Sequence, residues 1–302
     1  MRKRLLSSEA IAALGKLPLL AQEAVEGMLA GRHASPFHGF SAEFSDHRKY
    51  TAGDAVHDID WTAYARTDRY YVKRYREETN LRCSLVLDAS ASMGFASAGA
   101  AEDKGAEGAL SKLAYASRLA ACLAYLAIRQ RDAVGLTICQ NGVADSLPPA
   151  GTQAQLAEIF RRLESVQACG ASLLADALHA MAERLRRRSM AIILSDLLDD
   201  EVGLFKALRH LRYRRHSVIV FHILDPAEED LPYERVSDFI EPESGARLRA
   251  DPVALRADYQ EAIAAFRRRC RQECSADNIS YVEACTSEPF PRLLQRYLAC
   301  QR

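Results

Sequence analysis

From residue 81 onward, short apolar runs alternate with longer amphipathic stretches, and this alternation restricts the possible folds more than any other feature. The apolar runs are rich in Val, Ile and Leu, which is typical of strands buried on both faces of a sheet. Strands and helices in alternation predict an α/β fold with a doubly wound, mostly parallel sheet of the Rossmann type. The strands are expected at Arg82–Leu87, Ala133–Ile138, Ser189–Ser195, Ser217–Leu224 and Asn278–Glu283, and the helices at Leu113–Ile128, Gln153–Leu163, Leu173–Arg187, Glu201–Tyr213, Pro252–Cys274 and Pro291–Cys300.

The first 80 residues follow a different pattern. Two short helices are expected within the first 30 residues, and two strand-like segments follow at Ala42–Tyr50 and Tyr70–Tyr75. Because these strands do not continue the alternation, they indicate an appended unit rather than a part of the main sheet. We therefore expect a helical and β-rich attachment over residues 1–80 and the α/β domain over residues 81–302.

Charge and hydropathy exclude several classes of protein. The 302-residue chain has 40 Lys and Arg residues, balanced by 40 Asp and Glu residues. Its basic runs lie on three separate predicted helices or their ends, whereas a nucleic-acid interface needs them on one face, so we expect no nucleic-acid partner. Charged residues interrupt the segment after Met1–Arg4, which leaves no signal peptide, and the most apolar helix is short for a bilayer span. We expect a cytoplasmic protein without a membrane span.

The chain contains eight cysteines. Several of them fall within apolar strand or helix patterns, where cysteine behaves as a small buried hydrophobe. Cys270 and Cys274 lie one helical turn apart and have the spacing to share a metal, but no Cys-x-x-Cys motif or close Cys/His pair completes a zinc set. Reduced thiols are the better interpretation.

The loop after the first predicted strand carries one carboxylate and two hydroxyls at alternate positions, in Asp88-Ala-Ser90-Ala-Ser92. In an open parallel sheet, the carboxyl ends of the strands form the edge at which ligands bind. Oxygen groups of this kind suit Mg²⁺, which takes few protein ligands and keeps several waters. The same residue types also form turns and cap helices, so the pentapeptide alone leaves both interpretations open.

Two later segments favour the metal interpretation. Ser172 opens a predicted helix, and Asp196 ends a buried strand. Together the three segments resemble the metal-ion-dependent adhesion site of von Willebrand factor type A-like domains, whose relatives usually carry Thr where Ser172 stands. Ser keeps the ligating hydroxyl. The resemblance implies Mg²⁺, or another divalent cation such as Mn²⁺, bound directly by hydroxyls and directly or through water by carboxylates, from five side chains: Asp88, Ser90, Ser92, Ser172 and Asp196.

A longer series of motifs resembles the bacterial family catalogued as domain of unknown function 58. The series covers nearly the whole chain and includes Arg48-x-Tyr50, Gly53-Asp54, Ile59-Asp60-Trp61, Asp88-x-Ser-x-Ser-Met and His222-Ile-Leu-Asp-Pro-Ala-Glu228. His57 stands where the family pattern usually has Arg, and this departure leaves the role of the position open. The resemblance implies a von Willebrand A-like core that works with a MoxR-type AAA+ ATPase in a chaperone-like or complex-assembly role.

A binding module explains these features better than an enzyme does. The residues near Asp88 include no nucleophile elbow, no paired acid at the same strand end and no phosphate-binding loop. With few acids around it, the ion keeps a free position for a carboxylate from a client protein. The main alternative is a metal-dependent phosphohydrolase that uses the same residues, and a passive scaffold with a vestigial site also stays open. We expect a non-enzymatic, Mg²⁺-dependent protein-interaction module.

Overall fold

The computed structural model of the chain describes residues 21, 25, 44–49, 61, 64, 69–75, 81–97, 110–140, 143–185 and 188–300. The chain divides into two compact units, one made of Met1–Pro36 and Arg82–Arg302 and the other of Phe37–Leu81. Most of the first 80 residues lie outside the described ranges, so the expected division into 1–80 and 81–302 stays a prediction.

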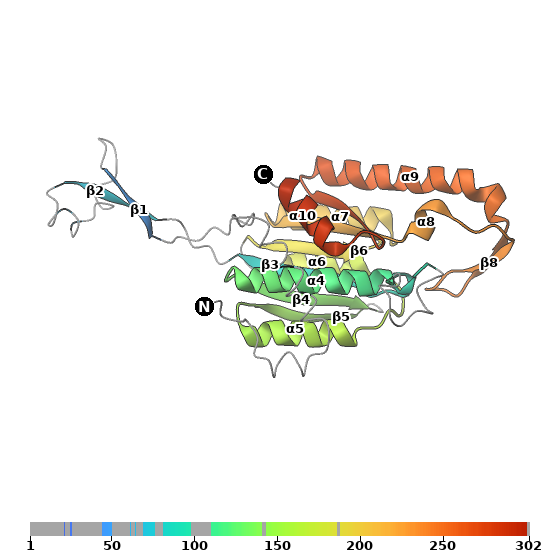
Figure 1. Cartoon of the computed structure of the whole chain (residues 1–302), viewed down its shortest axis with the longest axis horizontal. Coiled ribbons are helices and arrows are strands. Elements are labelled where there is room, and N and C mark those ends of the chain that lie inside the picture. The colour runs from blue at the N-terminus through green and yellow to red at the C-terminus, as the bar shows by residue number, and fades with distance from the viewer. Residues whose placement is uncertain are drawn as a thin grey trace. The chain divides into compact units, whose positions relative to one another are not determined.

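Within the described residues, a six-stranded sheet forms the centre of the larger unit (Figure 1). In spatial order, its strands are β10 (Ser280–Cys285), β7 (Ser217–Leu224), β6 (Met190–Ser195), β3 (Arg82–Asp88), β4 (Ala133–Gln140) and β5 (Val143–Ala150). Neighbouring strands run parallel, except that the edge strand β5 is antiparallel to β4. The predicted α/β fold with a mostly parallel, doubly wound sheet is confirmed.

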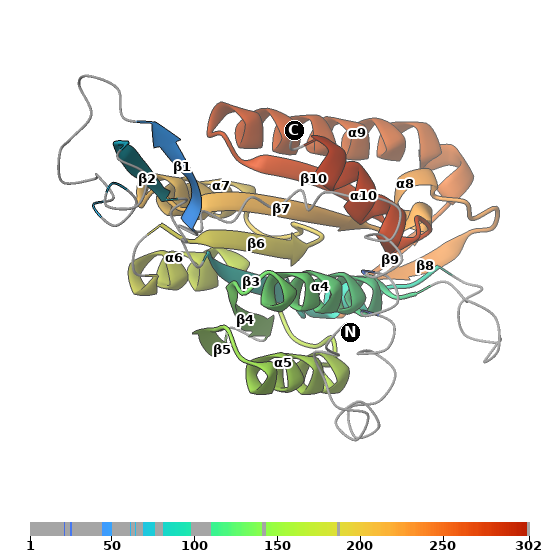
Figure 2. The ribbon, with the colours of Figure 1, turned by 60° about the vertical axis from the view of Figure 1, so that its left-hand side comes forward.

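Helices cover both faces of the sheet (Figure 2). One face carries α4 (Lys112–Arg129), α5 (Gln153–Ser165) and α10 (Phe290–Cys300), and the other carries α6 (Leu174–Arg184), α7 (Glu201–Tyr213) and α9 (Pro252–Ala276). The apolar side chains of α6, α7 and α9 form one core cluster with alternate strand residues such as Val86, Ala191 and Val220. This two-residue period places the remaining strand residues against the other helix layer.

The carboxyl ends of the parallel strands meet at one edge of the sheet, toward which the arrowheads of β6 and β7 point in Figure 2. The short helix η2 (Ala91–Gly94) follows β3 at this edge, and α8 (Pro226–Asp230) follows β7. A separate antiparallel ribbon, β8 (Ser237–Ile240) with β9 (Arg247–Ala250), lies at the same end of the unit. The functional side chains predicted from the sequence belong to this edge.

Most predicted elements begin and end within a few residues of the observed ones, and the last strand shows the reason for one difference. The strand was expected to begin at Asn278, but β10 begins at Ser280. Asn278 has a left-handed backbone, with φ 53°, and its N–H donates to the Ser275 carbonyl at the end of α9. Asn278 therefore ends the helix, as Asn commonly does, instead of starting the strand.

In the smaller unit, β1 (Phe44–Lys49) pairs antiparallel with β2 (Tyr71–Tyr75), which confirms the two predicted strand-like segments. Aromatic rings gather between these strands in the sequence. Tyr64 stacks on Tyr70 with ring centroids 4.5 Å apart, and Trp61 meets Tyr64 edge-on at 6.2 Å.

Some expectations from the sequence concern residues outside the described ranges. His57 is such a residue, so the role of this position stays open. The two helices expected within the first 30 residues also lie outside these ranges, apart from Ala21 and Val25, which are helical and buried. In the part of the chain that the structure describes, every helix is too short or too polar to cross a bilayer.

The edge strand β5 bulges where it passes Gly135 of β4. Pro148 and Pro149 lie opposite this single residue, so β5 carries one extra residue here, and their lack of an N–H suits an edge position. The backbones approach so closely here that a Cβ at Gly135 would lie 2.6 Å from the Leu147 carbonyl oxygen and 2.8 Å from the Pro149 nitrogen. Only glycine fits at this position without a shift of β5.

We expect Gly135→Ala to lower the free energy of unfolding by about 1–3 kcal/mol, because the added methyl group must displace the backbone of β5. Gly151→Ala is the matched control, since a Cβ there has its nearest neighbour at 3.5 Å, an ordinary contact. Urea denaturation of both variants and the wild type measures the difference. Equal stability of the two variants would contradict the close approach.

Candidate functional site

The candidate site begins at the end of β3. Asp88 is the last residue of the strand, and Ser90 and Ser92 follow in the turn that contains η2. All three are buried, with at most 6% of their surface exposed. The Ser90 N–H donates to Asp88 Oδ1 (3.0 Å), and the hydroxyls of Ser90 and Ser92 lie 3.1 Å apart. The spacing of these residues in the sequence therefore gathers three oxygen groups in one turn.

Two backbone hydrogen bonds attach the Ser172 loop to this turn. The Ala91 N–H donates to the Gly170 carbonyl (2.9 Å), and the Cys169 N–H donates to the carbonyl of the residue after Asp88 (3.0 Å). Gly170 has a φ of 73°, a left-handed conformation that glycine adopts without strain. As a result, the Ser172 hydroxyl lies 3.5 Å from Asp88 Oδ2, at the limit of a hydrogen bond.

β6 delivers Ser195 and Asp196 to the same edge. The Ser195 hydroxyl donates to Asp88 Oδ2 (2.6 Å) and accepts the backbone N–H two residues later (2.9 Å). The buried Asp196 accepts from the Leu198 N–H at Oδ1 (3.2 Å) and from Lys112 Nζ at Oδ2 (2.7 Å). Ser195 thus contacts Asp88 directly, while both carboxylate oxygens of Asp196 already have donors.

Lys112, in the first turn of α4, is a completely buried cation at this edge. Its Nζ donates to Asp196 Oδ2 and also to Glu228 Oε1 of α8 (2.6 Å). Burial disfavours the ammonium, but the two carboxylates outweigh burial and raise the pKa of Lys112 above its ordinary value. Lys112 therefore stays charged and joins α4, β6 and α8.

The motif that ends with Glu228 has a structural role. Asp225 caps α8, and Glu228 completes a capping box by accepting from the Asp225 N–H (3.2 Å). The fully buried Asp225 also accepts from the Ser97 N–H (3.2 Å) and the Thr286 hydroxyl (3.3 Å), which joins the loop after η2 to the end of β7. The capping box holds Glu228 where it meets Lys112.

Glu243 reaches the same region from the turn between β8 and β9. Its Oε2 accepts from the Ser172 N–H (3.2 Å). Its Oε1 is buried and has no hydrogen-bond partner among the described residues. A buried carboxylate oxygen without a donor or a cation is costly, so this atom marks a place where a positive charge is missing.

The pKa shifts show that burial, and to a smaller degree neighbouring charge, disfavours the ionised form of the Asp88 and Glu243 carboxyls. Burial, followed by the charge of Asp196, raises the pKa of Asp88 from 3.8 to about 6, although hydrogen bonds from Ser195 and Ser90 oppose the rise. Burial is also the largest cause of a raised pKa at Glu243, and the charge of Asp196 adds to it. No ion pair with Asp88 or Glu243 occurs among the described side chains, because Lys112 is bound to other carboxylates.

This set of groups fits a hard divalent cation. It consists of carboxylate and hydroxyl oxygens without thiolate or imidazole, which favours Mg²⁺ or Mn²⁺ over zinc. Within the described ranges, no group of three or more His, Cys, Asp or Glu side chains could hold an ion. A cation at this edge would therefore depend on the serine hydroxyls, and the unsatisfied oxygen of Glu243 supports its presence.

The predicted ligands fall into two groups. One group is linked by hydrogen bonds around the end of β3: Asp88, Ser90, Ser92 and Ser172. Asp196 lies at the same edge, close enough for its charge to act on Asp88, but its side chain is bound to Lys112. The structure thus brings four of the predicted ligands into contact and places the fifth beside them.

Sequence reasoning missed Ser195, Lys112 and Glu243. The position of Lys112 offered a signal, because a basic residue in the first turn of a helix opposes the helix dipole. Ser195 offered another, since it directly precedes Asp196 at a strand end. No local pattern distinguishes Glu243 from the other acids of its turn.

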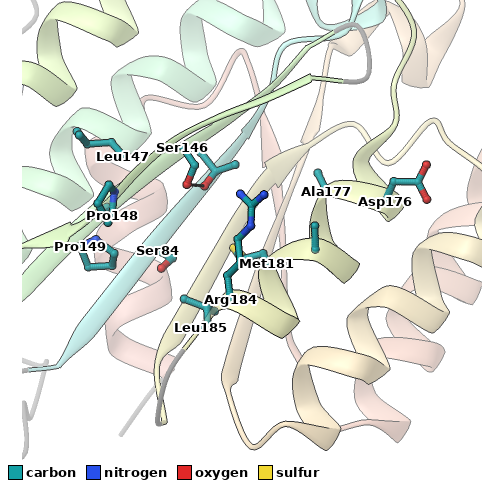
Figure 3. A pocket seen from close by; sticks show the side chains of 13 residues that line it. Ser84, Ser146, Leu147, Pro148, Pro149, Asp176, Ala177, Met181, Arg184 and Leu185 are labelled. Carbon is teal, nitrogen blue, oxygen red and sulfur yellow. Dashed lines mark hydrogen bonds between the residues drawn. The ribbon is translucent and has the colours of Figure 1, made fainter.

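A cavity of about 530 Å³ lies elsewhere, between α6 and the hairpin of β4 and β5 (Figure 3). None of the predicted metal ligands lines it. Figure 3 shows Arg184 extending toward Ser146, with Met181 on the same helix, α6, and Leu185 directly after the end of that helix. Its charged lining residues are Asp176 and Arg184, and its hydroxyl groups come from Ser84, Thr137 and Ser146.

Cys270 and Cys274 belong to the core cluster under α9 instead of a metal site. Burial raises the pKa of each thiol to about 12, so in the metal-free protein both are protonated at neutral pH. The cysteines that the structure describes with placed side chains are free.

Comparison with known proteins gives a family for the chain. The family model described as "Protein of unknown function DUF58" matches residues 46–269. The uncharacterised protein Rv1480 of Mycobacterium tuberculosis is 32% identical over 264 residues, which cover 85% of this chain and 78% of the relative. These matches confirm the family resemblance expected from the motif series.

Solved structures with similar folds share little sequence with this chain. The conserved hypothetical protein BatB from Bacteroides thetaiotaomicron aligns with 73% of this chain and 98% of its own, at 18% identity and a TM-score of 0.47. The VWA domain of SpRpn10 aligns with 72% of this chain and 94% of its own, at 11% identity and a TM-score of 0.39.

We expect Asp88→Asn to stabilise the metal-free protein above pH 6. Folded Asp88 holds its proton more tightly than unfolded Asp88, so stability falls as the pH rises from 3.8 to about 6 and stays reduced above it. The neutral amide removes this penalty of up to about 3 kcal/mol. Denaturation in EDTA at pH 4 and pH 7.5 measures the effect, and a variant less stable than the wild type at pH 7.5 would contradict it.

Proposed function

The chain belongs to the DUF58 family, and we propose that its α/β domain is a non-enzymatic protein-interaction module that depends on one divalent cation, Mg²⁺ or Mn²⁺. The observation that carries the proposal is the convergence of buried oxygen groups with uncompensated negative charge at the end of β3. Soluble proteins bury such groups only at a cost, which a bound cation offsets.

Four side chains would hold the ion directly: Asp88, Ser90, Ser92 and Ser172. Asp196 would act through a water, because one of its oxygens is bound to Lys112 and the other to a backbone N–H. Ser195 would hold the Asp88 carboxylate in place through its 2.6 Å hydrogen bond. When bound, the ion supplies a positive charge and vacant coordination positions at the surface edge of the sheet.

The charge of this ligand set favours binding over hydrolysis. Asp88 is the one direct ligand with a negative charge among the four proposed, and the other three are neutral hydroxyls. An ion with so few anionic ligands keeps a strong attraction for a further carboxylate. The described hydrogen bonds of the Ser90 and Ser92 hydroxyls are with each other and with Asp88, a proposed ligand, and none of them involves a histidine that would serve as a base. We infer that the ion's natural ligand is an Asp or Glu of a client protein.

The partnership with a MoxR-type AAA+ ATPase is a further part of the proposal, and the family resemblance is its support. In this reading the ATPase and the metal module act together on a client in the cytoplasm, in a chaperone-like or complex-assembly role. The metal site provides the client contact, and the ATPase provides the energy.

Mn²⁺ and Mg²⁺ are expected to bind the purified protein with one site and to raise its melting temperature. Ser92→Ala should weaken Mn²⁺ binding at least about tenfold, and Asp88→Ala should abolish it, because each removes a proposed ligand. Isothermal titration calorimetry measures the affinity. Ser146→Ala is the control, since this hydroxyl contacts Thr137 at the distant cavity, and equal loss of binding in the control would sink the assignment.

A co-purification with a MoxR-type ATPase tests the partnership. We expect the ATPase to be captured in Mg²⁺ together with the client that the ion binds, and to be lost in EDTA and in Asp88→Ala but not in Ser146→Ala. Capture that is insensitive to EDTA and to Asp88→Ala would show that the metal site is not the contact. Mg²⁺-dependent hydrolysis of a phosphoester that disappears in Ser92→Ala would instead support the phosphohydrolase alternative.

A further inference from the structure

We propose that Glu243 is an additional ligand of the ion and fills, from within the chain, the coordination position that the client's carboxylate takes. The inference rests on the proposed metal site and adds the way in which access to that site is regulated. The ribbon of β8 and β9 is then the element that closes the site in the free protein.

The contacts of Glu243 place its carboxylate beside the proposed ligands. Oε2 accepts from the Ser172 N–H at 3.2 Å, and the hydroxyl of the same serine lies 3.5 Å from Asp88 Oδ2. Oε1 is buried without a hydrogen-bond partner among the described residues, so one carboxylate oxygen remains for a cation.

Neighbouring acids do not offer the same free oxygen. Asp199 accepts from the Ala175 N–H at Oδ2 (3.3 Å) and from a backbone N–H at Oδ1 (2.7 Å). Glu241 is exposed and accepts from the Ser244 hydroxyl within its own turn. Of these three carboxylates, Glu243 is the one whose geometry suits an ion next to Ser172.

The turn that carries Glu243 has a defined conformation. The Glu241 N–H donates to the Ala246 carbonyl (2.8 Å), and the Gly245 N–H donates back to the Glu241 carbonyl (2.9 Å). Gly245 has a φ of 73°, which this turn requires and which glycine provides without strain. Both strands hold the turn at the strand-end edge, so Glu243 points to the site as part of a preformed element.

Few described contacts join the ribbon to the rest of the unit, and one of them is the edge-on contact of Phe239 with Tyr233, with ring centroids 5.8 Å apart. In the described part of the chain, the bond from Ser172 to Glu243 is the hydrogen bond that links residues 238–250 to elements outside the ribbon. The ribbon pairs only with itself, so lifting it breaks no strand pairing of the main sheet. The side chains of Ile240 and Leu248 on the ribbon are 53% and 64% exposed. They give a client protein apolar surface beside its carboxylate contact.

Water proton relaxation with Mn²⁺ tests the inference on the full-length protein, because it reports both Mn²⁺ affinity and the number of waters on the bound ion. Glu243→Gln keeps an acceptor for the Ser172 N–H but removes the charge, so we expect about tenfold weaker Mn²⁺ binding and about one more bound water. Glu243→Asp, which shortens the reach, should shift both quantities in the same direction. Glu241→Gln, in the same turn, should match the wild type.

Acetate serves as the probe for a free carboxylate. In Glu243→Gln, acetate should displace the additional water and lower the relaxation at concentrations that leave the wild type unchanged. Identical Mn²⁺ affinity, water number and acetate response in the wild type and in Glu243→Gln would overturn the role of Glu243 while leaving the metal site in place. Absence of any Mn²⁺ effect on the wild type and on all variants would overturn the metal site itself, and the inference with it.

Discussion

The buried ion pair of Lys112 with Asp196 and Glu228 is the interaction on which the organisation of the site depends. A buried charge is tolerated only when partners surround it, and breaking such a pair commonly costs about 3–5 kcal/mol. Lys112 is fully buried, and its two carboxylates come from different elements, so one ammonium fixes the positions of α4, β6 and α8. The same ammonium forms its ion pairs with Asp196 and Glu228 and none with Asp88 among the described side chains. The negative charge of Asp88 is left for another cation.

Without a bound cation, the buried charge of Asp88 therefore raises the free energy of the folded protein. Asp88 is held in a buried position by Ser195 and by its own turn, although its carboxyl is hard to ionise there. Strain of this kind is common where binding takes priority over stability, and it is released when the ligand arrives. The motif ending in Glu228 stabilises the ion pair of Lys112, since its capping box fixes the position of the Glu228 carboxylate. This motif thus serves the site without supplying a proposed ligand.

The sequence allowed a prediction of the fold and of part of the site, for reasons that differ between residues. Strand and helix periods are local, so the sheet and its helices follow from the apolar pattern. Asp196 was predictable because strand ends of a parallel sheet meet at one edge, whatever their separation in the chain. Ser172 lies between α5 and α6, and its prediction came from the resemblance to the metal-ion-dependent adhesion site. Lys112 was missed because its role depends on where a long side chain reaches across the sheet edge, and the helix was expected to start one residue later, at Leu113. Glu243 was missed because no periodic pattern says where an isolated ribbon lies against the sheet.

The two prolines in β5 have a consequence for how copies of this chain meet. Unpaired N–H groups along an edge strand are the usual template for the addition of a foreign strand. Pro148 and Pro149 interrupt that row at the open side of the sheet, and their bulge bends the strand away from a straight template. A strand of another protein therefore cannot form a continuous row of backbone hydrogen bonds with β5. Recruitment there must proceed through side chains, which can discriminate between partners and release them again.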